Sequence, residues 1–313
     1  MSIVGDSPLQ TTGGLLTKED YGEVIKTICE VFDCTPNEIK SIAPLQKGLS
    51  NVLLSFWLRG GSYVYRHSGL GAEILIDRGR ESILQKIVED AGIDHTLISM
   101  SVRYGWRISR YIEARPFDYH NLNDVVRGIG LLRKLHNAPT KVRWEFDIWE
   151  KAEYIKNLIP QDQYGQLFDG FHQIKENIFR LYQLAKTDGI KKCLCHGDCR
   201  DENFLINDRE IHLIDWEYAG YADPGFDIGT YICGGEHTDE DIQRILYIYF
   251  CRAPTAIEKR HFIAYIAIAG YFYMNWTMFK ESEGQIIGNL KRLWYHYAKT
   301  YSKIALTLYE SEA

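Results

Sequence analysis

Three oxygen-bearing side chains in the second half of the chain could together carry out phosphoryl transfer. The run CHGDCRDENFLINDREIHLIDWE, residues 195–217, contains Asp198, then Asn203 five residues later, then Asp215. Phosphoryl transfer needs a carboxylate to orient or deprotonate a hydroxyl, and it needs oxygen ligands to hold Mg²⁺ on the phosphates. We therefore expect Asp198 to act as the base and Asn203 and Asp215 to bind the cation.

A short hairpin is predicted to bring these residues together. The segments NFLIN (203–207) and EIHLID (210–215) read as two strands that turn at Asp208-Arg209, so residue 215 returns beside residue 203. Asp and Asn are common in ordinary turns, and each of the three residues could be no more than that. Their joint spacing around two strands favours the functional interpretation.

The elements around this hairpin divide the chain into a mixed first part and a helical second part. Before residue 113 the patterns predict helices at 17–33 and 78–90, and strand pairs at 51–58 with 62–67 and 98–104 with 106–112. In helix 78–90 the apolar stripe is Ile83, Leu84, Ile87 and Val88. After Pro116 helices are predicted at 123–136, capped by Asn123, and at 148–158, 163–186 and within 238–310. We expect two domains, 1–113 and 114–313.

Composition excludes some classes of protein. Among 313 residues, 36 Lys+Arg against 42 Asp+Glu give a net charge of −6, so no basic surplus exists to bind nucleic acid. The seven cysteines show no disulfide framework, and no signal peptide is visible, which predicts a cytoplasmic location. The uncharged stretch 262–279 is long enough to approach a membrane span, but its tyrosines, Asn275 and Trp276 favour a buried helix. We therefore expect no membrane association.

The run Cys193-x-Cys195-His196-x2-Cys199 could in principle bind zinc. Alternate residues of a strand share a face, so Cys193 and Cys195 would point to one side and His196 to the other. No second Cys/His pair follows at a regular spacing. Buried, reduced thiols are the expected state of these cysteines.

The motifs HGDCRDEN (196–203) and LIDWEYAGYADPGFDIG (213–229) resemble the aminoglycoside phosphotransferase and choline kinase superfamily, most closely the choline/ethanolamine kinases. The resemblance runs from about Pro44 to the C-terminal helices. It implies an α+β, protein-kinase-like, two-lobed fold, with a small N-lobe built on an antiparallel sheet and a mostly helical C-lobe. It also implies use of ATP with Mg²⁺, with Asp198 as base, Asn203 and Asp215 as metal ligands, and Asp227 bracing the catalytic loop through its backbone amides. His196 is expected to be structural, because Asp198 already fills the acid/base role.

The first part of the chain would hold the nucleotide. GLSNVLL (48–54) stands in place of the phosphate-covering loop, and backbone N–H groups near Gly48, Ser50 and Asn51 could cap phosphate oxygens. This loop departs from the GxGxxG of protein kinases. Arg66 stands where protein kinases place lysine, as in choline kinases, and Glu81 could pair with it. Alternatively, Arg66 is a surface charge and Glu81 a solvated helix residue.

The resemblance places the adenine contact at the hinge RISRYIEAR (107–115), through the backbone from Arg110 to Ile112. For the acceptor, the family builds a cage of aromatic rings and carboxylates around a cationic amine. The candidates here are Tyr273 and Trp276, Trp294 and Tyr297, and Glu217 and Tyr218. Each of the aromatic residues could instead be core packing.

Taken together, these features predict a cytoplasmic kinase that transfers the γ-phosphoryl group of ATP to choline, a small amino alcohol. One alternative is an enzyme of the same fold that phosphorylates ethanolamine, thiamine, an aminoglycoside or a sugar alcohol. Another is a nucleotide-binding module without catalytic activity.

Overall fold

The computed structural model describes residues 9–11, 14–16, 18–45, 51–68, 75–140, 142–160, 170–285 and 287–311. The chain forms two compact units. Unit 1 comprises residues 1–89 and 94–114, and unit 2 comprises residues 90–93 and 115–313.

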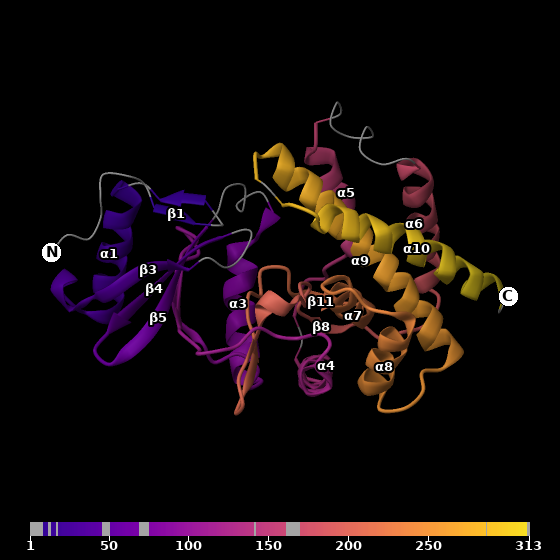
Figure 1. The fold of residues 1–313 in the computed structure, drawn as a ribbon, viewed down its shortest axis with the longest axis horizontal. Helices are drawn as coiled ribbons and strands as arrows, with labels where there is room; N and C mark the ends of the chain where they lie inside the picture. The colour runs from indigo at the N-terminus through magenta and orange to yellow at the C-terminus, as the bar shows by residue number, and fades with distance from the viewer. Residues whose placement is uncertain are drawn as a thin grey trace. The chain divides into compact units, whose positions relative to one another are not determined.

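Unit 1 is built on a five-stranded antiparallel sheet with the strand order β3-β4-β5-β7-β6 (Figure 1). The strands are β3 (Lys40–Leu45), β4 (Asn51–Leu58), β5 (Gly61–Ser68), β6 (Leu97–Met100) and β7 (Arg107–Arg110). β1 (Leu9–Thr11) and β2 (Gly14–Leu16) form a separate antiparallel pair. The predicted β4–β5 hairpin is confirmed, with Leu58 opposite Gly61 across the tight turn. The second predicted pair forms as the shorter strands β6 and β7.

Helix α1 (Lys18–Phe32) packs its apolar side on the sheet. Val24 and Ile28 are buried in one core cluster with Leu54, Phe56 and Ile108. The turn η1 (Pro36–Glu38) follows α1, and Glu38 bonds the backbone N–H of Thr35. The sheet therefore has a continuous hydrophobic core beneath α1, which holds β4 and β5 in place.

The bounds predicted for helix 78–90 are confirmed by α3 (Arg78–Asp90), but its predicted apolar stripe is wrong in part. Leu84 and Val88 are buried, whereas the side chain of Ile83 is 53% exposed. The polar residues Glu81 and Gln85 take its place on the buried face. Both have hydrogen-bond partners there, Arg66 and Asp94, which makes their burial tolerable.

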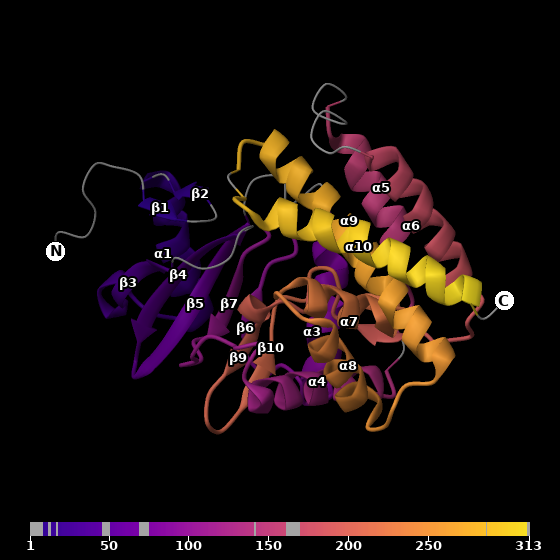
Figure 2. The same cartoon turned by 45° about the vertical axis from the view of Figure 1, so that its right-hand side comes forward.

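Unit 2 is mostly helical (Figures 1 and 2). Its helices are α4 (Leu122–His136), α5 (Ile148–Leu158), α6 (Phe171–Ala185), α7 (Pro224–Cys233), α8 (Asp239–Phe250), α9 (Ala256–Ser282) and α10 (Leu290–Ser311). The α5 bounds agree with prediction. The predicted cap Asn123 is wrong, because Asn121 precedes α4 and its side chain accepts from the Asn123 N–H. Residues 163–169 of the predicted helix 163–186 lie outside the described residues, and α6 begins at Phe171.

Two small antiparallel strand pairs carry the loops of unit 2. β8 (Cys193–Cys195) pairs with β11 (Gly220–Ala222), and β9 (Phe204–Ile206) pairs with β10 (Ile211–Leu213). The turn η2 (Asp201–Asn203) leads into β9. The predicted hairpin around Asp208-Arg209 is thus confirmed, with strands shorter than the sequence pattern indicated.

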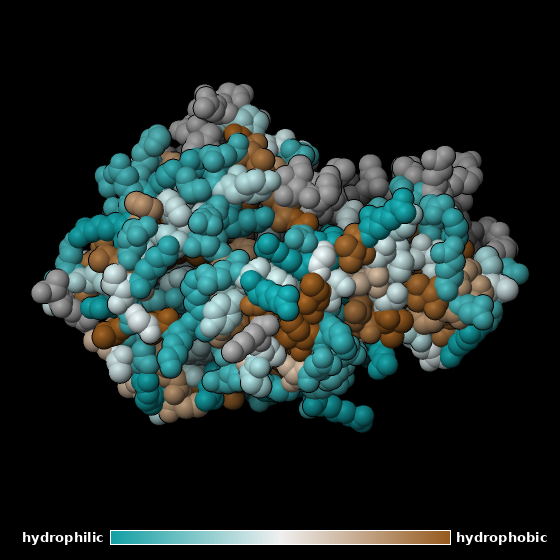
Figure 3. All heavy atoms as spheres, turned by 180° about the vertical axis from the view of Figure 1, so that it is seen from behind, coloured by the Kyte–Doolittle hydropathy of each residue, from teal (hydrophilic) through white to brown (hydrophobic). Residues whose placement is uncertain are grey.

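Helix α9 is the core of unit 2. It packs against α10, α7, α5 and α6, and α10 lies alongside it in both views (Figures 1 and 2). It has the length and composition of a membrane span, yet its most apolar window is wholly buried inside the protein, as expected for a core helix. On the face drawn in Figure 3, hydrophobic residues form small groups among hydrophilic ones.

Candidate active site

Asp198 lies in the loop after β8, and three side chains hold its carboxylate. Oδ1 accepts from the Tyr273 hydroxyl at 2.5 Å and from Arg200 Nε at 3.0 Å. Oδ2 accepts from Asn203 Nδ2 at 2.9 Å. The side chain of Asp198 is buried but not sealed, with an exposed fraction of 12%. An attacking hydroxyl could therefore reach a carboxylate whose orientation is already fixed.

These neighbours keep Asp198 ionised. Burial by itself raises the pKa of the carboxyl, but the Arg200 guanidinium and the Tyr273 hydroxyl outweigh it and hold the pKa below its ordinary value. A base that is charged at neutral pH can accept the proton of an alcohol or orient it by a hydrogen bond.

The loop that carries Asp198 is fixed from α7. The carboxylate of Asp227 accepts from the backbone N–H groups of His196 at 2.8 Å and Gly197 at 2.7 Å. His196 accepts from the Asp198 N–H at Nδ1 and donates from Nε2 to the Ile214 carbonyl. Nδ1 thus braces the loop internally, and Nε2 ties it to the end of β10.

Gly197 is the residue that this turn requires. Its φ is +86°, and a Cβ at this position would lie 2.7 Å from the Tyr218 carbonyl oxygen. A side chain would therefore both strain the backbone and collide with it.

The β9–β10 hairpin brings Asn203 and Asp215 to one end. The Ile214 N–H donates to the Asn203 carbonyl oxygen at 3.0 Å, so Asp215 follows directly after a residue bonded to Asn203. Asp215 has a φ of +71°, a conformation that Asp tolerates better than most residues and that is found at functional turns. The side-chain nitrogen of Asn203, Nδ2, is engaged with Asp198. The side-chain oxygen, Oδ1, is therefore the atom suited to bind a cation.

A group of aromatic rings adjoins Asp198 from α9 and α10. The Tyr273 ring stacks on Trp294, with ring centroids 4.7 Å apart, and Trp294 also contacts Trp276 edge-on. Trp276 donates from Nε1 to the Tyr218 hydroxyl at 3.0 Å. We call Tyr218, Tyr273, Trp276 and Trp294 the aromatic cluster. All four rings are buried.

Carboxylates surround the Tyr218 side of this cluster. Burial raises the pKa of the Tyr218 hydroxyl, and the negative charges of Glu217, Asp198 and Asp215 raise it further. A negative potential beside aromatic faces suits a cationic ligand.

The structure does not place Tyr297 with the aromatic cluster. Its hydroxyl binds the Gly235 carbonyl oxygen at 2.5 Å, and its ring stacks on Tyr301. Trp294 combines core packing with membership of the aromatic cluster. Its Nε1 donates to the Cys233 carbonyl oxygen, and its ring contacts Tyr273. These contacts favour core packing for Tyr297.

In unit 1, Arg66 and Glu81 form the ion pair that the sequence suggested. Arg66 Nη2 lies 2.6 Å from Glu81 Oε1, and Arg78 Nη1 lies 2.6 Å from Glu81 Oε2. Burial raises the pKa of Glu81, but Arg66, Arg78 and Arg107 together lower it to about 2. Arg66 and Glu81 are buried, so neither is a solvated surface charge.

The remaining nucleotide candidates of unit 1 are only partly described. Gly48 and Ser50 lie outside the described residues. Asn51 begins β4 and is buried, and its Oδ1 has no hydrogen-bond partner among the described residues. Arg110 ends β7 with its N–H bonded to Thr96, and Ile112 follows two residues later.

Arg200 is a site residue that the sequence reasoning missed. Its guanidinium bonds Asp198 and lies 5.9 Å from the centre of the Tyr273 ring. It also approaches Glu202 at 3.4 Å. Its place two residues after Asp198 in HGDCR was the available signal, because a cation that close in sequence can return to the carboxylate.

Comparison with known proteins gives consistent matches. The sequence model of the choline/ethanolamine kinase family matches residues 42–273. The protein LicA of Haemophilus influenzae is 26% identical over 257 residues, which span 78% of this chain and 94% of LicA.

Solved structures share the fold. The choline kinase LicA from Streptococcus pneumoniae aligns with a TM-score of 0.75 and 21% identity, covering 94% of this chain and 100% of that one. A structure of LicA in complex with AMP aligns with a TM-score of 0.76 and 22% identity, covering 90% and 98%. Aminoglycoside phosphotransferases share it too. The predicted α+β, protein-kinase-like fold is confirmed.

Proposed function

The chain belongs to the choline/ethanolamine kinase family and is a phosphotransferase that acts on an alcohol group, and we propose that it transfers the γ-phosphoryl group of ATP to the hydroxyl of choline. The product would be phosphocholine. The observation that carries the proposal is that one residue, Tyr273, both bonds the Asp198 carboxylate and stacks within the aromatic cluster. The base and a surface suited to a cationic amine are thereby held together.

In this proposal Asp198 orients the choline hydroxyl and accepts its proton as the new O–P bond forms, while the bond from the γ-phosphorus to the β–γ bridging oxygen breaks and ADP leaves. Asn203, Arg200 and Tyr273 hold the carboxylate in position, so little reorganisation is needed when the hydroxyl attacks. Arg200 also places a positive charge beside the Asp198 carboxylate. Negative charge develops close to this point when the acceptor oxygen attacks the phosphoryl group. The Arg66–Glu81 pair is proposed to steady the nucleotide phosphates, with Asn51 and the backbone near Gly48 and Ser50 covering them.

Asn203 and Asp215 are the residues proposed to bind Mg²⁺. Both offer oxygen donors, which this hard cation prefers, and the hairpin holds them at one end. When bound, the cation neutralises phosphate charge. The adenine would be met by the backbone from Arg110 to Ile112.

Choline is proposed over other acceptors because four aromatic rings gather beside the Asp198 carboxylate, and three carboxylates make the surroundings of Tyr218 negative. A quaternary ammonium gains about 0.5–2 kcal/mol from each good ring contact and needs no hydrogen-bond acceptor. Ethanolamine would instead need acceptors for its N–H groups. An aminoglycoside carries several ammonium groups and would need a more acidic surface.

The test is turnover with MgATP on a panel of acceptors: choline, ethanolamine, thiamine and an aminoglycoside. The expected result is the highest kcat/KM for choline, with phosphocholine identified by phosphorus NMR. Asp198→Asn protein, purified in the same way, controls for contaminating kinases. A higher kcat/KM for another acceptor would refute choline as the substrate, and no product with any acceptor would support the inactive module.

We also propose a cytoplasmic location without membrane association. All seven cysteines are free thiols, which agrees with a reducing compartment, and the longest apolar helix is buried in unit 2.

A further inference from the structure

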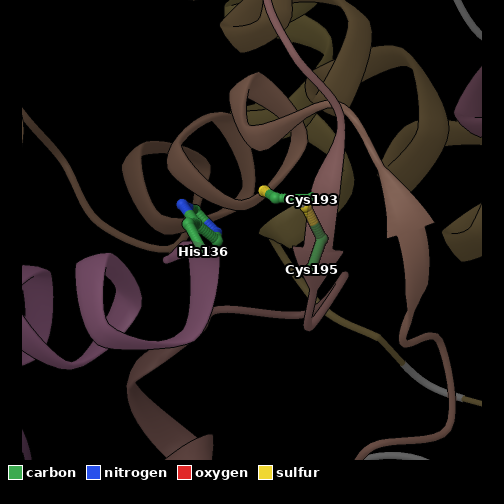
Figure 4. A group of neighbouring side chains, drawn as sticks. All are labelled: His136, Cys193 and Cys195. Atoms are coloured by element: carbon green, nitrogen blue, oxygen red, sulfur yellow. Dashed lines mark hydrogen bonds between the residues drawn. The ribbon is translucent and has the colours of Figure 1, made fainter. Parts of the chain in front are cut away.

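A second cluster of chemically reactive side chains lies behind the catalytic loop, at the end of α4 and on β8. It consists of His136, Cys193 and Cys195, whose ligand atoms all lie within 4.8 Å of one another (Figure 4). Cys193 and Cys195 are two apart on β8 and share a face, while His136 comes from α4, 57 residues earlier. The proposed phosphoryl transfer uses none of the three.

The two sulfurs are spaced for a shared metal ion. Cys193 Sγ and Cys195 Sγ are 3.7 Å apart. Tetrahedral zinc with Zn–S bonds of about 2.3 Å holds two thiolate sulfurs about 3.8 Å apart. A disulfide would need to shorten the separation to about 2.05 Å, between residues held two apart on a paired strand. The geometry therefore fits chelation better than oxidation.

Both ring nitrogens of His136 have hydrogen-bond partners. Nε2 bonds Asp227 Oδ2 at 2.9 Å, and Nδ1 bonds the Tyr249 hydroxyl at 2.8 Å, so a metal ion on Nδ1 would take the place of that hydroxyl. A carboxylate on the far nitrogen is the usual means of fixing a zinc-binding histidine. The Tyr249 hydroxyl therefore lies beside the imidazole whose ligand atom is within 4.8 Å of both sulfurs.

We propose that His136, Cys193 and Cys195 form a zinc site, with Nδ1 and the two sulfurs as ligands and a fourth position for water. Cys193 is half-buried, whereas the His136 side chain is only 4% exposed and Cys195 is buried, so an ion would enter on the Cys193 side. Two thiolates balance the charge of Zn²⁺, and the imidazole completes the set when Nδ1 carries no proton. Binding forms two Zn–S bonds and one Zn–N bond, and the two thiol protons pass to solvent.

The experiment uses the full chain, purified under reducing conditions and stripped of metal with a chelator. Zinc binding is measured by competition with a chromophoric chelator, and cobalt binding by its thiolate charge-transfer absorption. The expected result is one zinc per chain, with affinity lowered at least about 100-fold in Cys193→Ser and Cys195→Ser, since loss of even an outer partner costs 10–100-fold. Circular dichroism checks that both variants fold.

The controls separate this site from the other thiols. Cys251→Ser changes an exposed thiol, and the double variant Cys29→Ser, Cys34→Ser removes the thiol pair of unit 1. Both should bind zinc as the parent does. Tyr249→Phe should bind zinc more tightly, because the hydroxyl no longer competes for Nδ1. Zinc below one tenth of an equivalent, or binding that persists in Cys193→Ser, would overturn the proposal, and an unchanged affinity in Tyr249→Phe would remove His136 from it.

Discussion

The hydroxyl of Tyr273, in the middle of α9, donates a 2.5 Å hydrogen bond to Oδ1 of Asp198, in the loop after β8. These residues are 75 positions apart in the sequence. The bond joins the proposed base to the helix that carries the aromatic cluster. A change on this helix can therefore affect both the chemical step and the binding of the acceptor.

Tyr273→Phe should move the acidic limb of the kcat/KM profile to higher pH. The Tyr273 hydroxyl helps to lower the pKa of Asp198, so its removal lets that pKa rise. The pH dependence of choline turnover measures the shift. Tyr271→Phe is the matched control, because Tyr271 is a buried tyrosine of the same helix that bonds Glu153 instead. An equal shift in both variants would argue against a specific Tyr273 effect.

Asp198→Asn should lower kcat by about 10²–10⁴-fold, the usual contribution of a positioned base, and leave nucleotide affinity within a few-fold of the parent. Single-turnover kinetics and calorimetric titration with a non-hydrolysable ATP analogue measure the two effects. Near-normal turnover would show that Asp198 is not the base.

Trp276→Leu should raise the KM for choline by about tenfold, corresponding to the loss of one ring contact of about 1–2 kcal/mol, and change the KM for ATP little. Steady-state kinetics with each substrate varied in turn gives both constants. Tyr297→Phe serves as the control, since its hydroxyl holds the Gly235 carbonyl, and it should affect stability but neither KM. Parallel increases in both constants for Trp276→Leu would remove Trp276 from the acceptor site.

Glu81→Gln should destabilise the protein by about 3 kcal/mol at pH 7, because Glu81 has its pKa lowered from 4.5 to about 2 among Arg66, Arg78 and Arg107. A carboxyl group whose pKa is lowered in the folded state stabilises that state at pH values above its ordinary pKa. This stabilisation is lost as the pH falls from about 4.5 towards 2. The difference in the free energy of unfolding between parent and variant should therefore narrow over that range. Urea unfolding followed by tryptophan fluorescence measures it.

The control for Glu81→Gln is Arg80→Gln on the same helix. Arg80 pairs with Asp77 through side chains that are 53% and 59% exposed, so its loss should cost less than about 1 kcal/mol at every pH. A constant difference for Glu81→Gln across the acidic range would show that its charge is not the source of the stabilisation.

Local patterns predicted the elements well where one face is apolar and the turns are distinctive. The hairpin at Gly60-Gly61 and the bounds of α3 and α5 follow from such signals. The buried face of α3 did not, because Glu81 and Gln85 are buried through partners on other elements, and a hydrophobicity pattern cannot register a polar residue that has a partner elsewhere.

The site was predictable as far as its motif is contiguous. One hairpin and the loop before it contain Asp198, Asn203 and Asp215. Their positions in the sequence therefore determine how close they lie in the structure. Arg200 was overlooked although it lies in the same motif. The approach of His136 to Cys193 depends on how α4 packs beside β8, which no local pattern encodes.

The match to the family's sequence model ends at Tyr273, and Trp276 and Trp294 come after it. Membership of the family therefore supports the reaction, whereas the proposed choice of acceptor rests in part on two rings that the matched segment does not include. Variants of these two rings test directly which alcohol the protein uses.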